Sequence, residues 1–390
     1  MTVPLLERIR TEIREEGPMR FDRFMALALY DEAEGYYGGG AGTRAGTEGD
    51  FVTAPTLTPW FGATVARFAS AVWERLGKPD AWHIVEAAAG TGALAIPLLE
   101  RLREEAPAAY GALRYTLVDV DPAHRDAARR GLQTHIEAGH VEVVETLPKS
   151  VGPTLVLANE LLDNLPVRLL RRRAEAWWER LVALDDSKEQ DVRFVWHEAP
   201  APQDLIDQVE SFGIPVPDGQ LVEVPVGAEA WLQEITDKTE PPTFLLLVDY
   251  GEVARDLLGE PRPEGTLRTY SGHRKDLPVL EYPGSRDITT HVSWTAAARA
   301  AERLGWKVHG FATQSAFLRD LGLLQTAAGL AATVQDEAGM ASLAALKEIL
   351  LPGGMGEDVK VLCLERAVPQ DGRLPGFSNV RPVDPRPRGD

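Results

Sequence analysis

Short apolar runs alternate with amphipathic segments after residue 80. The runs with the length and composition of β-strands are His83–Ala87, Tyr115–Val120, Val141–Val144, Thr154–Ala158, Phe244–Val248, Lys307–Phe311 and Val359–Glu365. Helical patterns separate the first three runs, and strands that alternate with helices predict parallel βαβ units in a doubly wound sheet. Leu155–Ala158 is apolar at every position, as expected of a strand buried on both faces. The pattern therefore predicts an α/β fold.

The segments outside these strands divide the chain further. Residues 1–80 are expected to form a helical N-terminal cap that also carries a glycine-rich loop at 35–49, and its helical patterns are Leu5–Glu16, Arg20–Tyr30 and Thr58–Leu76. The next strongly apolar strand after the fourth begins only at Phe244, which predicts an insertion at 168–243. The sheet would then be built from residues 81–167 and 244–374. The Pro- and Arg-rich segment 375–390 is expected to be disordered.

Composition narrows the class of protein. The net charge of −18 argues against broad nucleic-acid binding, which depends on basic surface. The single cysteine, Cys363, fits a reducing compartment, and Met1–Gly17 lacks the apolar core of a secretory signal. No run of about 18 apolar residues predicts a membrane span, and the eight histidines lack the spacing of a metal site. We therefore expect a cytoplasmic protein without a membrane span or a metal.

The most informative stretch is Val85–Gly92, with the sequence VEAAAGTG. It follows an expected strand and precedes a helical pattern at Ala93–Leu102, and this strand–turn–helix arrangement is typical of a nucleotide-type cofactor site. Glu86 indicates which cofactor fits. Its carboxylate would repel a pyrophosphate, whereas S-adenosylmethionine (SAM) brings a sulfonium and an ammonium cation. The turn therefore favours SAM, with contacts expected from Gly90 and Gly92.

A dinucleotide remains an alternative for the same turn. Residues 90–95 match the pattern G-x-G-x-x-A, and Asp119 ends the next expected strand. A carboxylate at that place can accept both ribose hydroxyls of an adenosine. The other interpretation of Asp119 is a helix N-cap, but Asp121, which precedes Pro122, is the better candidate for the cap.

A second polar segment, Asn159–Pro166, follows the fourth expected strand. Ligands of open α/β sheets lie beyond the carboxyl ends of the strands, which places Asn159 and Glu160 against the cofactor turn. Glu160 and Asp163 would share one face if the segment is helical. Two carboxylates on one wall suit a cationic acceptor such as a guanidinium. The alternative is that both acids only cap a helix or face solvent.

Taken together, these segments resemble the MidA-like family of class I SAM-dependent methyltransferases, from about Gly17 to Phe377. The matching motifs, in chain order, are Leu29-Tyr30, Gly35-Tyr36-Tyr37, Gly49-Asp50-Phe51, Thr53-Ala54-Pro55, Phe61-Gly62, Glu86 with Gly90 and Gly92, Asn159-Glu160 with Asp163 and Pro166, Asp249-Tyr250-Gly251, Gly265-Thr266-Leu267-Arg268, His273, Asp287 with Thr289 and His291, and Gly353-Gly354-Met355-Gly356.

The resemblance implies a Rossmann-like methyltransferase sheet that transfers a methyl group from SAM to an arginine of a protein substrate. Mitochondrial members of the family are complex I assembly factors that dimethylate an arginine of a complex I subunit. For this reaction Glu160 and Asp163 are the candidate catalytic residues, because their carboxylates could localise charge on the guanidinium and accept the displaced proton. The segment with Asp50 and Thr53 is expected to close over the cofactor, and the turn residue Ala88 is expected to contact it.

Two departures from the family pattern leave other functions open. Ala88 stands where the family usually has glycine, and Thr56 and Thr58 stand where it usually has glutamate and serine. The alternatives are a SAM methyltransferase acting on a small molecule, a SAM-binding assembly factor without turnover, and a nicotinamide oxidoreductase, which Glu86 disfavours. The sequence does not predict the oligomeric state.

Overall fold

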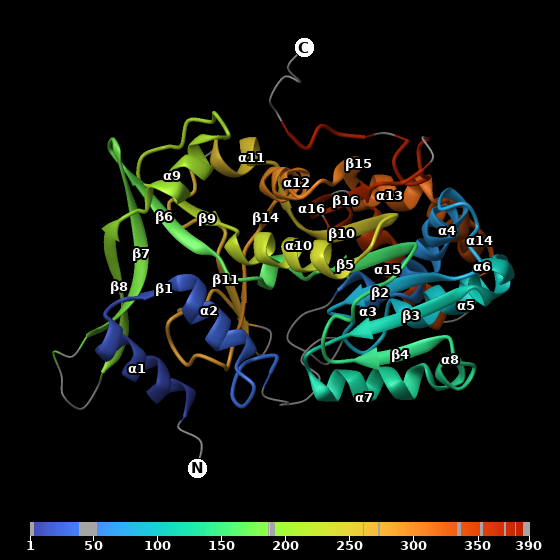
Figure 1. Ribbon diagram of the computed structural model, residues 1–390, viewed down its shortest axis with the longest axis horizontal. Helices are drawn as coiled ribbons and strands as arrows, with labels where there is room; N and C mark the ends of the chain where they lie inside the picture. Colours follow the sequence, from blue (N-terminus) through green and yellow to red (C-terminus); the bar gives the residue numbers. More distant parts are fainter. Residues whose placement is uncertain are drawn as a thin grey trace.

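The computed structural model describes residues 4–38, 53–185, 187, 192–259, 261–271, 274–333, 337–351, 354–369, 372–378 and 380–384. Two sheets lie side by side along its longest axis (Figure 1). We call the eight-stranded sheet the central sheet and the five-stranded sheet around β7 (Ala176–Asp185) the inserted sheet. A small three-stranded sheet consists of β11 (Arg268–Ser271), β12 (Arg274–Lys275) and β13 (Asp287–Thr289).

The central sheet has the strand order β15-β16-β10-β5-β2-β3-β4, and β14 pairs with β10. Every predicted strand is present in it: β2 (Trp82–Ala87), β3 (Leu113–Val118), β4 (Val141–Val144), β5 (Thr154–Asn159), β10 (Thr243–Glu252), β15 (Lys307–Thr313) and β16 (Val359–Arg366), with β14 (Val292–Ser293) in addition. The strands from β10 to β4 are parallel, which confirms the α/β prediction. β16, however, is antiparallel to both of its neighbours. Its apolar pattern could not reveal this, because a strand buried on both faces reads alike in either direction.

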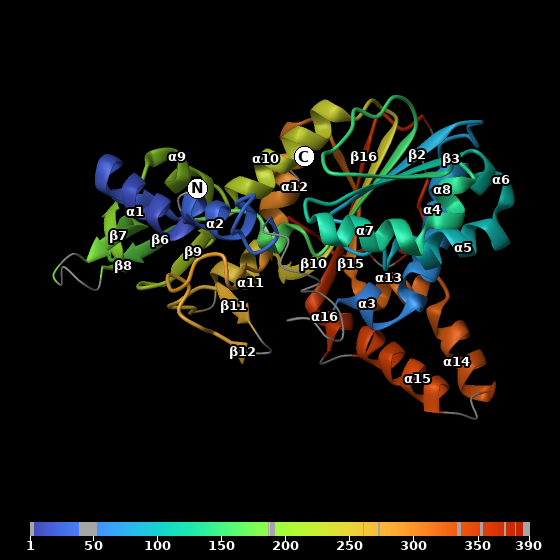
Figure 2. The same ribbon diagram turned by 90° about the horizontal axis from the view of Figure 1, so that it is seen from below.

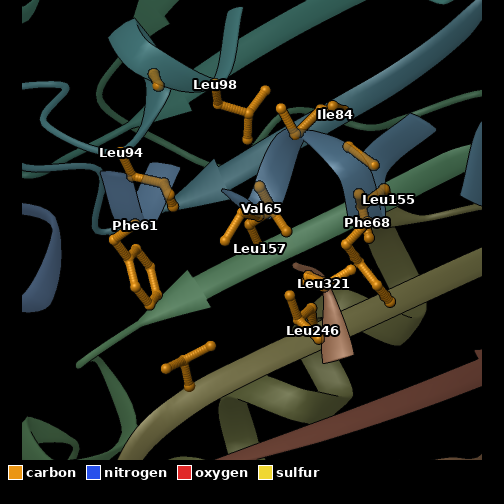
Figure 3. Packing of buried hydrophobic residues seen from close by; sticks show 14 of the residues in the cluster. Phe61, Val65, Phe68, Ile84, Leu94, Leu98, Leu155, Leu157, Leu246 and Leu321 are labelled. Atoms are coloured by element: carbon orange, nitrogen blue, oxygen red, sulfur yellow. The ribbon is translucent and has the colours of Figure 1, made fainter. Parts of the chain in front are cut away.

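Helices cover both faces of the central sheet. On one face, Phe61, Val65 and Phe68 of α4 pack against the sheet residues Ile84 and Leu157 (Figure 3). The other face is covered by α10 (Val226–Lys238) and α12 (Trp294–Arg303). The remaining helices beside this sheet are α3 (Ala54–Leu57), α4 (Pro59–Arg75), α5 (Ala95–Glu105), α6 (Pro107–Gly111), α7 (Pro122–Gly131), α8 (Gln133–Glu137), α13 (Gln314–Asp320) and α16 (Met355–Asp358). Figure 2 shows α14 (Leu323–Thr333) and α15 (Glu337–Leu350) extending away from the sheet.

The segment predicted as one helical cap, residues 1–80, is divided between the two sheets. The short strand β1 (Met19–Arg20) pairs with β7, and this pairing draws α1 (Leu5–Glu16) and α2 (Phe21–Tyr30) onto the inserted sheet. α4 instead belongs to the core of the central sheet. The inserted sheet has β6 (Arg168–Arg173), β7 (Ala176–Asp185), β8 (Arg193–Pro200) and β9 (Leu221–Val224), with α9 (Gln203–Glu210) and α11 (Ala254–Leu258) beside it.

The tail from residue 375, predicted to be disordered, is packed in its described part. Phe377 is fully buried, and its ring centroid lies 5.3 Å from that of Phe317. Arg299 of α12 donates hydrogen bonds of 2.9 Å to both carboxylate oxygens of Asp384. The Pro- and Arg-rich composition did not reveal this order. A few apolar side chains are enough to hold such a segment in place when each fills a gap in a core that already exists. None of the described helices is long and apolar enough to cross a membrane.

Candidate active site

A cavity of about 490 Å³ lies at the carboxyl ends of β2, β3 and β5. Ala87, Asp119 and Asn159, at or just beyond the ends of these strands, line it. Side chains from the N-terminal segment, including Tyr30 and Tyr37, form another part of the wall. Open α/β sheets bind ligands at this edge, and the volume is typical of a site for a cofactor or small ligand.

The predicted cofactor turn follows β2 and consists largely of backbone in the left-handed region. Ala88, Gly90 and Gly92 have φ angles of 53°, 54° and 83°. Ala88 and Gly90 line the cavity, whereas Gly92 does not and instead shapes the turn that leads to α5. The side chain of Ala88 is exposed on the cavity side. The turn thus presents backbone and small side chains to a ligand.

Asp119 is buried and closes the turn from β3. Its Oδ2 accepts a 2.7 Å hydrogen bond from the Gly90 N–H, and its Oδ1 accepts one of 2.9 Å from the Asp121 N–H. His124 Nδ1 lies 3.4 Å from Oδ1. Asp121 caps α7 by accepting from the Ala123 N–H, as predicted. The Gly90 N–H, which would face a pyrophosphate in a dinucleotide site, is therefore already bound to a carboxylate.

Glu86 is buried beneath the turn and 3% exposed. Burial, and to a smaller degree the charge of Asp119, raise the pKa of Glu86 to about 8, against a lowering hydrogen bond from Tyr115. The Tyr115 hydroxyl donates that bond over 2.7 Å. A cation beside Glu86 would favour its charged form. This wall of the cavity is thus suited to a positively charged ligand.

Glu160 lines the cavity at the end of β5. Its φ of 49° is unusual for a side chain of this size. Asn159 Nδ2 lies 3.4 Å from its Oε1, and the Ala54 N–H hydrogen-bonds its carboxylate. Burial, and after it the charge of Asp249, raise the pKa of Glu160 to about 8. The carboxyl group can therefore exchange a proton near neutral pH.

Asp163 does not share the wall with Glu160, in contrast to the prediction. After Glu160 the chain forms a short 3-10 helix, η1 (Leu162–Asn164), and Asp163 is 9% exposed and absent from the cavity lining. Burial, then the charges of Asp249 and Asp287, raise its pKa well above the usual range. The two acids do not belong to one regular helix, because the left-handed backbone at Glu160 precedes the helical turn.

The tyrosine wall of the cavity was not predicted from the sequence. Tyr30 ends α2, and its hydroxyl donates to the Asn164 carbonyl oxygen over 3.1 Å. The Tyr37 hydroxyl donates to Asp287 over 2.9 Å, and Asn164 Nδ2 donates to the same Asp287 oxygen over 2.8 Å. The motif Tyr36-Tyr37 is recognisable in the sequence, but no local pattern indicates that Tyr37 would contact residues 164 and 287.

The cap segment reaches the site only in part. Asp50, one of the predicted cofactor residues, and most of the glycine-rich loop lie outside the described residues. Thr53 lines the cavity and caps α3 together with Thr56, since each side chain accepts a hydrogen bond from the other residue's backbone N–H. Glutamate is the common partner in such a capping box. Thr56 therefore keeps the structural role that a glutamate would have there.

Comparison with known proteins agrees with the geometry at β2 and β3. Residues 64–312 match a protein-family model described as a putative S-adenosyl-L-methionine-dependent methyltransferase. The chain belongs to this methyltransferase family. The matched region includes Glu86, Asp119 and Glu160. The fold is that of a class I SAM-dependent methyltransferase, and its cofactor is SAM.

Individual relatives of the methyltransferase cover most of its length. It is 27% identical to the mitochondrial protein arginine methyltransferase NDUFAF7 of Danio rerio over 82% of this chain and 76% of that one. The human protein of the same name is 24% identical, with coverages of 82% and 74%. A COG1565 superfamily member from Burkholderia thailandensis, solved with bound S-adenosyl-homocysteine, has a TM-score of 0.83 and 29% identity and covers 97% of this chain and 98% of that one.

These relatives correct the predicted location. The curated relatives are mitochondrial, which contradicts the cytoplasmic prediction. That prediction relied on the single cysteine, the lack of a membrane span and the lack of an apolar leader. It failed because mitochondrial targeting segments are amphipathic and do not need an apolar core.

Ala88 allows a direct test of the turn of the methyltransferase. Ala88→Gly should raise the free energy of unfolding by about 0.5–1 kcal/mol, because left-handed backbone costs a residue with a Cβ about 1–2 kcal/mol and the added chain entropy of glycine offsets part of this gain. Ala174→Gly is the matched control, since Ala174 has a φ of 48° in the exposed turn between β6 and β7. Urea unfolding should show similar stabilisation in both, and a loss of stability in Ala88→Gly alone would contradict the assignment of strain.

Proposed function

We propose that this SAM-dependent methyltransferase methylates the guanidinium group of an arginine side chain in a protein. The observation that carries the proposal is the set of ionisable groups in the cavity wall. Its described lining contains no lysine or arginine but contains the carboxyl groups of Glu86, Asp119, Glu145, Glu160 and Glu234. Such a wall attracts a cationic acceptor and repels phosphates and carboxylic acids. The curated relatives named protein arginine methyltransferases support the same acceptor.

The cofactor side of the cavity is assigned as follows. Asp119 accepts the ribose hydroxyls, since each carboxylate oxygen can accept a further hydrogen bond beside those from Gly90 and Asp121. Glu86 faces the ammonium group. The remaining cofactor contacts that we propose come from Ala88, Gly90, Asn159 and Thr53, and Gly92 supports them by shaping the turn.

Glu160 carries the chemistry of the acceptor in this proposal. Bound SAM supplies an electrophilic methyl group, so the protein has to orient a nitrogen and take up a proton. A free guanidinium with a pKa above about 12 does not lose its proton near neutral pH. The Glu160 carboxylate would localise positive charge on the other guanidinium nitrogens and then accept the displaced proton. We assign no contact with the acceptor to Asp163, because it does not line the cavity.

The acceptor assignment is tested by incubating the purified enzyme with methyl-labelled SAM and extracts of cells that lack it. We expect the label on arginine side chains of protein, identified by mass spectrometry of digested fractions. Glu160→Gln in parallel shows which label depends on the enzyme. Label only in small molecules would replace the arginine assignment by a small-molecule acceptor. A protein that binds SAM but transfers no label to any fraction would be an assembly factor without turnover.

The pH dependence of the reaction gives a second test. Glu160 must be ionised to accept a proton, and its pKa is raised to about 8. The value of kcat/KM for the acceptor should therefore increase about tenfold per pH unit below the pKa and reach a plateau above it. Initial rates at saturating SAM and subsaturating acceptor between pH 6 and pH 9.5, about the range where the ionised fraction changes, report this ionisation in the complex of enzyme and SAM, in which Glu86 already faces the cofactor. A flat profile, or one that falls as the pH rises, would contradict the role of Glu160.

A further inference from the structure

Asp249 is a fully buried acid on β10 that the proposed reaction does not yet use. β10 pairs with β5 so that Val248 lies opposite Asn159, and Asp249 is therefore adjacent to the segment that begins at Glu160. A buried carboxylate is costly unless hydrogen bonds compensate for the lost water. Asp249 therefore needs hydrogen-bond donors around its carboxylate, and the residues that provide them indicate its role.

The donors are consecutive backbone groups of the active-site segment. Asp249 Oδ2 accepts from the N–H groups of Leu161, Leu162 and Asp163, over 3.0, 2.8 and 3.3 Å. Its Oδ1 accepts from the Tyr250 N–H over 2.7 Å. N–H groups at the start of a helical turn have no partner within the helix. Asp249 therefore caps η1 from a neighbouring strand.

These bonds fix the backbone on both sides of Glu160. The Glu160 N–H donates to the Val248 carbonyl oxygen over 2.8 Å, and the next N–H, of Leu161, donates to Asp249. Glu160 itself has the left-handed φ of 49°. Such a conformation persists only where the surrounding structure enforces it. The end of β10 provides this constraint and keeps Glu160 on the cavity wall.

Asp249 also acts on Glu160 through its charge. After burial, the charge of Asp249 is the largest cause that raises the pKa of Glu160. The other polar and charged groups that face Glu160 are the Asn159 amide and the Ala54 N–H, which lower its pKa, and Tyr250 and Asp163, which interact with it electrostatically. A negative neighbour makes a carboxylate a stronger proton acceptor.

We propose that Asp249 is the positioning residue of the acceptor site, which holds the backbone that places Glu160 on the cavity wall and sets a second carboxylate beside that segment. This inference rests on the proposed role of Glu160. Asp249 does not line the cavity and is not expected to touch the acceptor or the cofactor.

The test measures the titration of Glu160 itself. In full-length protein labelled with 13C at the glutamate carboxyl groups, the NMR resonance that disappears in Glu160→Gln belongs to Glu160. Asp249→Asn keeps an oxygen acceptor but removes the charge, and it should lower the Glu160 pKa by about one unit or more. Asp287→Asn is the matched control, because Asp287 is also buried, with 2% of its surface exposed, but is not among the groups that shift the pKa of Glu160. This control should leave the titration unchanged.

An unchanged Glu160 titration in Asp249→Asn would overturn the inference, as would an equal shift in both variants. Asp249→Glu provides a second variant in case the amide does not fold. It keeps the charge but displaces the carboxylate by one methylene, so the Glu160 pKa should remain high while transfer of label from SAM decreases. A low Glu160 pKa in this variant would also overturn the inference. If the titrations behave as expected but the enzyme labels no arginine, only the proposed acceptor fails.

Discussion

Glu160→Gln should reduce methyl transfer by about 100-fold or more, in line with the loss of a proton acceptor. The affinity for SAM should stay within about twofold, well under 1 kcal/mol, because Glu160 is assigned to the acceptor and not to the cofactor. Calorimetry with SAM and single-turnover transfer of label measure the two effects separately. Simultaneous loss of binding and transfer would make Glu160 a cofactor residue, and full activity would make it structural.

Asp163→Asn tests whether an acid of this segment must line the cavity to affect methyl transfer. Both acids are in the same segment, but only Glu160 lines the cavity. Burial raises the pKa of Asp163 well above its usual range, and asparagine keeps the size and shape of this side chain, which does not reach the cavity. Transfer should therefore stay within about tenfold of the wild-type rate, or about 1.4 kcal/mol. A loss as large as that of Glu160→Gln would restore the original expectation that both acids are catalytic.

Asp119→Ala should weaken SAM by about 1–3 kcal/mol, or about 5- to 150-fold in Kd, because it removes charge-assisted hydrogen bonds to the ribose. The structure adds a second reason, since the same carboxylate holds the Gly90 N–H and the Asp121 N–H. Asp119→Asn should be intermediate, because the amide keeps one oxygen acceptor. Calorimetry with SAM measures both variants.

Unchanged SAM affinity in Asp119→Ala would exclude this carboxylate from the cofactor site. A titration with NAD serves as the control for cofactor class. NAD should show no binding at concentrations up to about 1 mM. A Kd of about 1 mM corresponds to a binding free energy of only about 4 kcal/mol. The reason is that its pyrophosphate would meet Glu86 and Asp119 instead of free N–H groups.

The sequence by itself determined the central sheet and its cofactor edge. Each of the seven predicted strands is a short run whose own side chains must be buried, so its composition is sufficient to locate it, whereas the two-residue strand β14 is too short to be found in this way. The turn after β2 was equally readable, because strand, small residues and helix follow one another directly, and Glu86 indicated a cationic cofactor. The charge of Glu160 and its place at the end of β5 also followed from the order of elements along the chain.

Only the tertiary structure decided which residues meet across the site. Asp163 leaves the cavity wall because the backbone at Glu160 is left-handed and Asp249, far away in sequence, holds the next turn. Tyr37 reaches the cavity through a bond to Asp287, and α2 follows β1 onto the inserted sheet. A local pattern records that a side chain is buried or polar. It does not record the partner, because hydrogen bonds and packing contacts between distant segments arise only when the chain is folded.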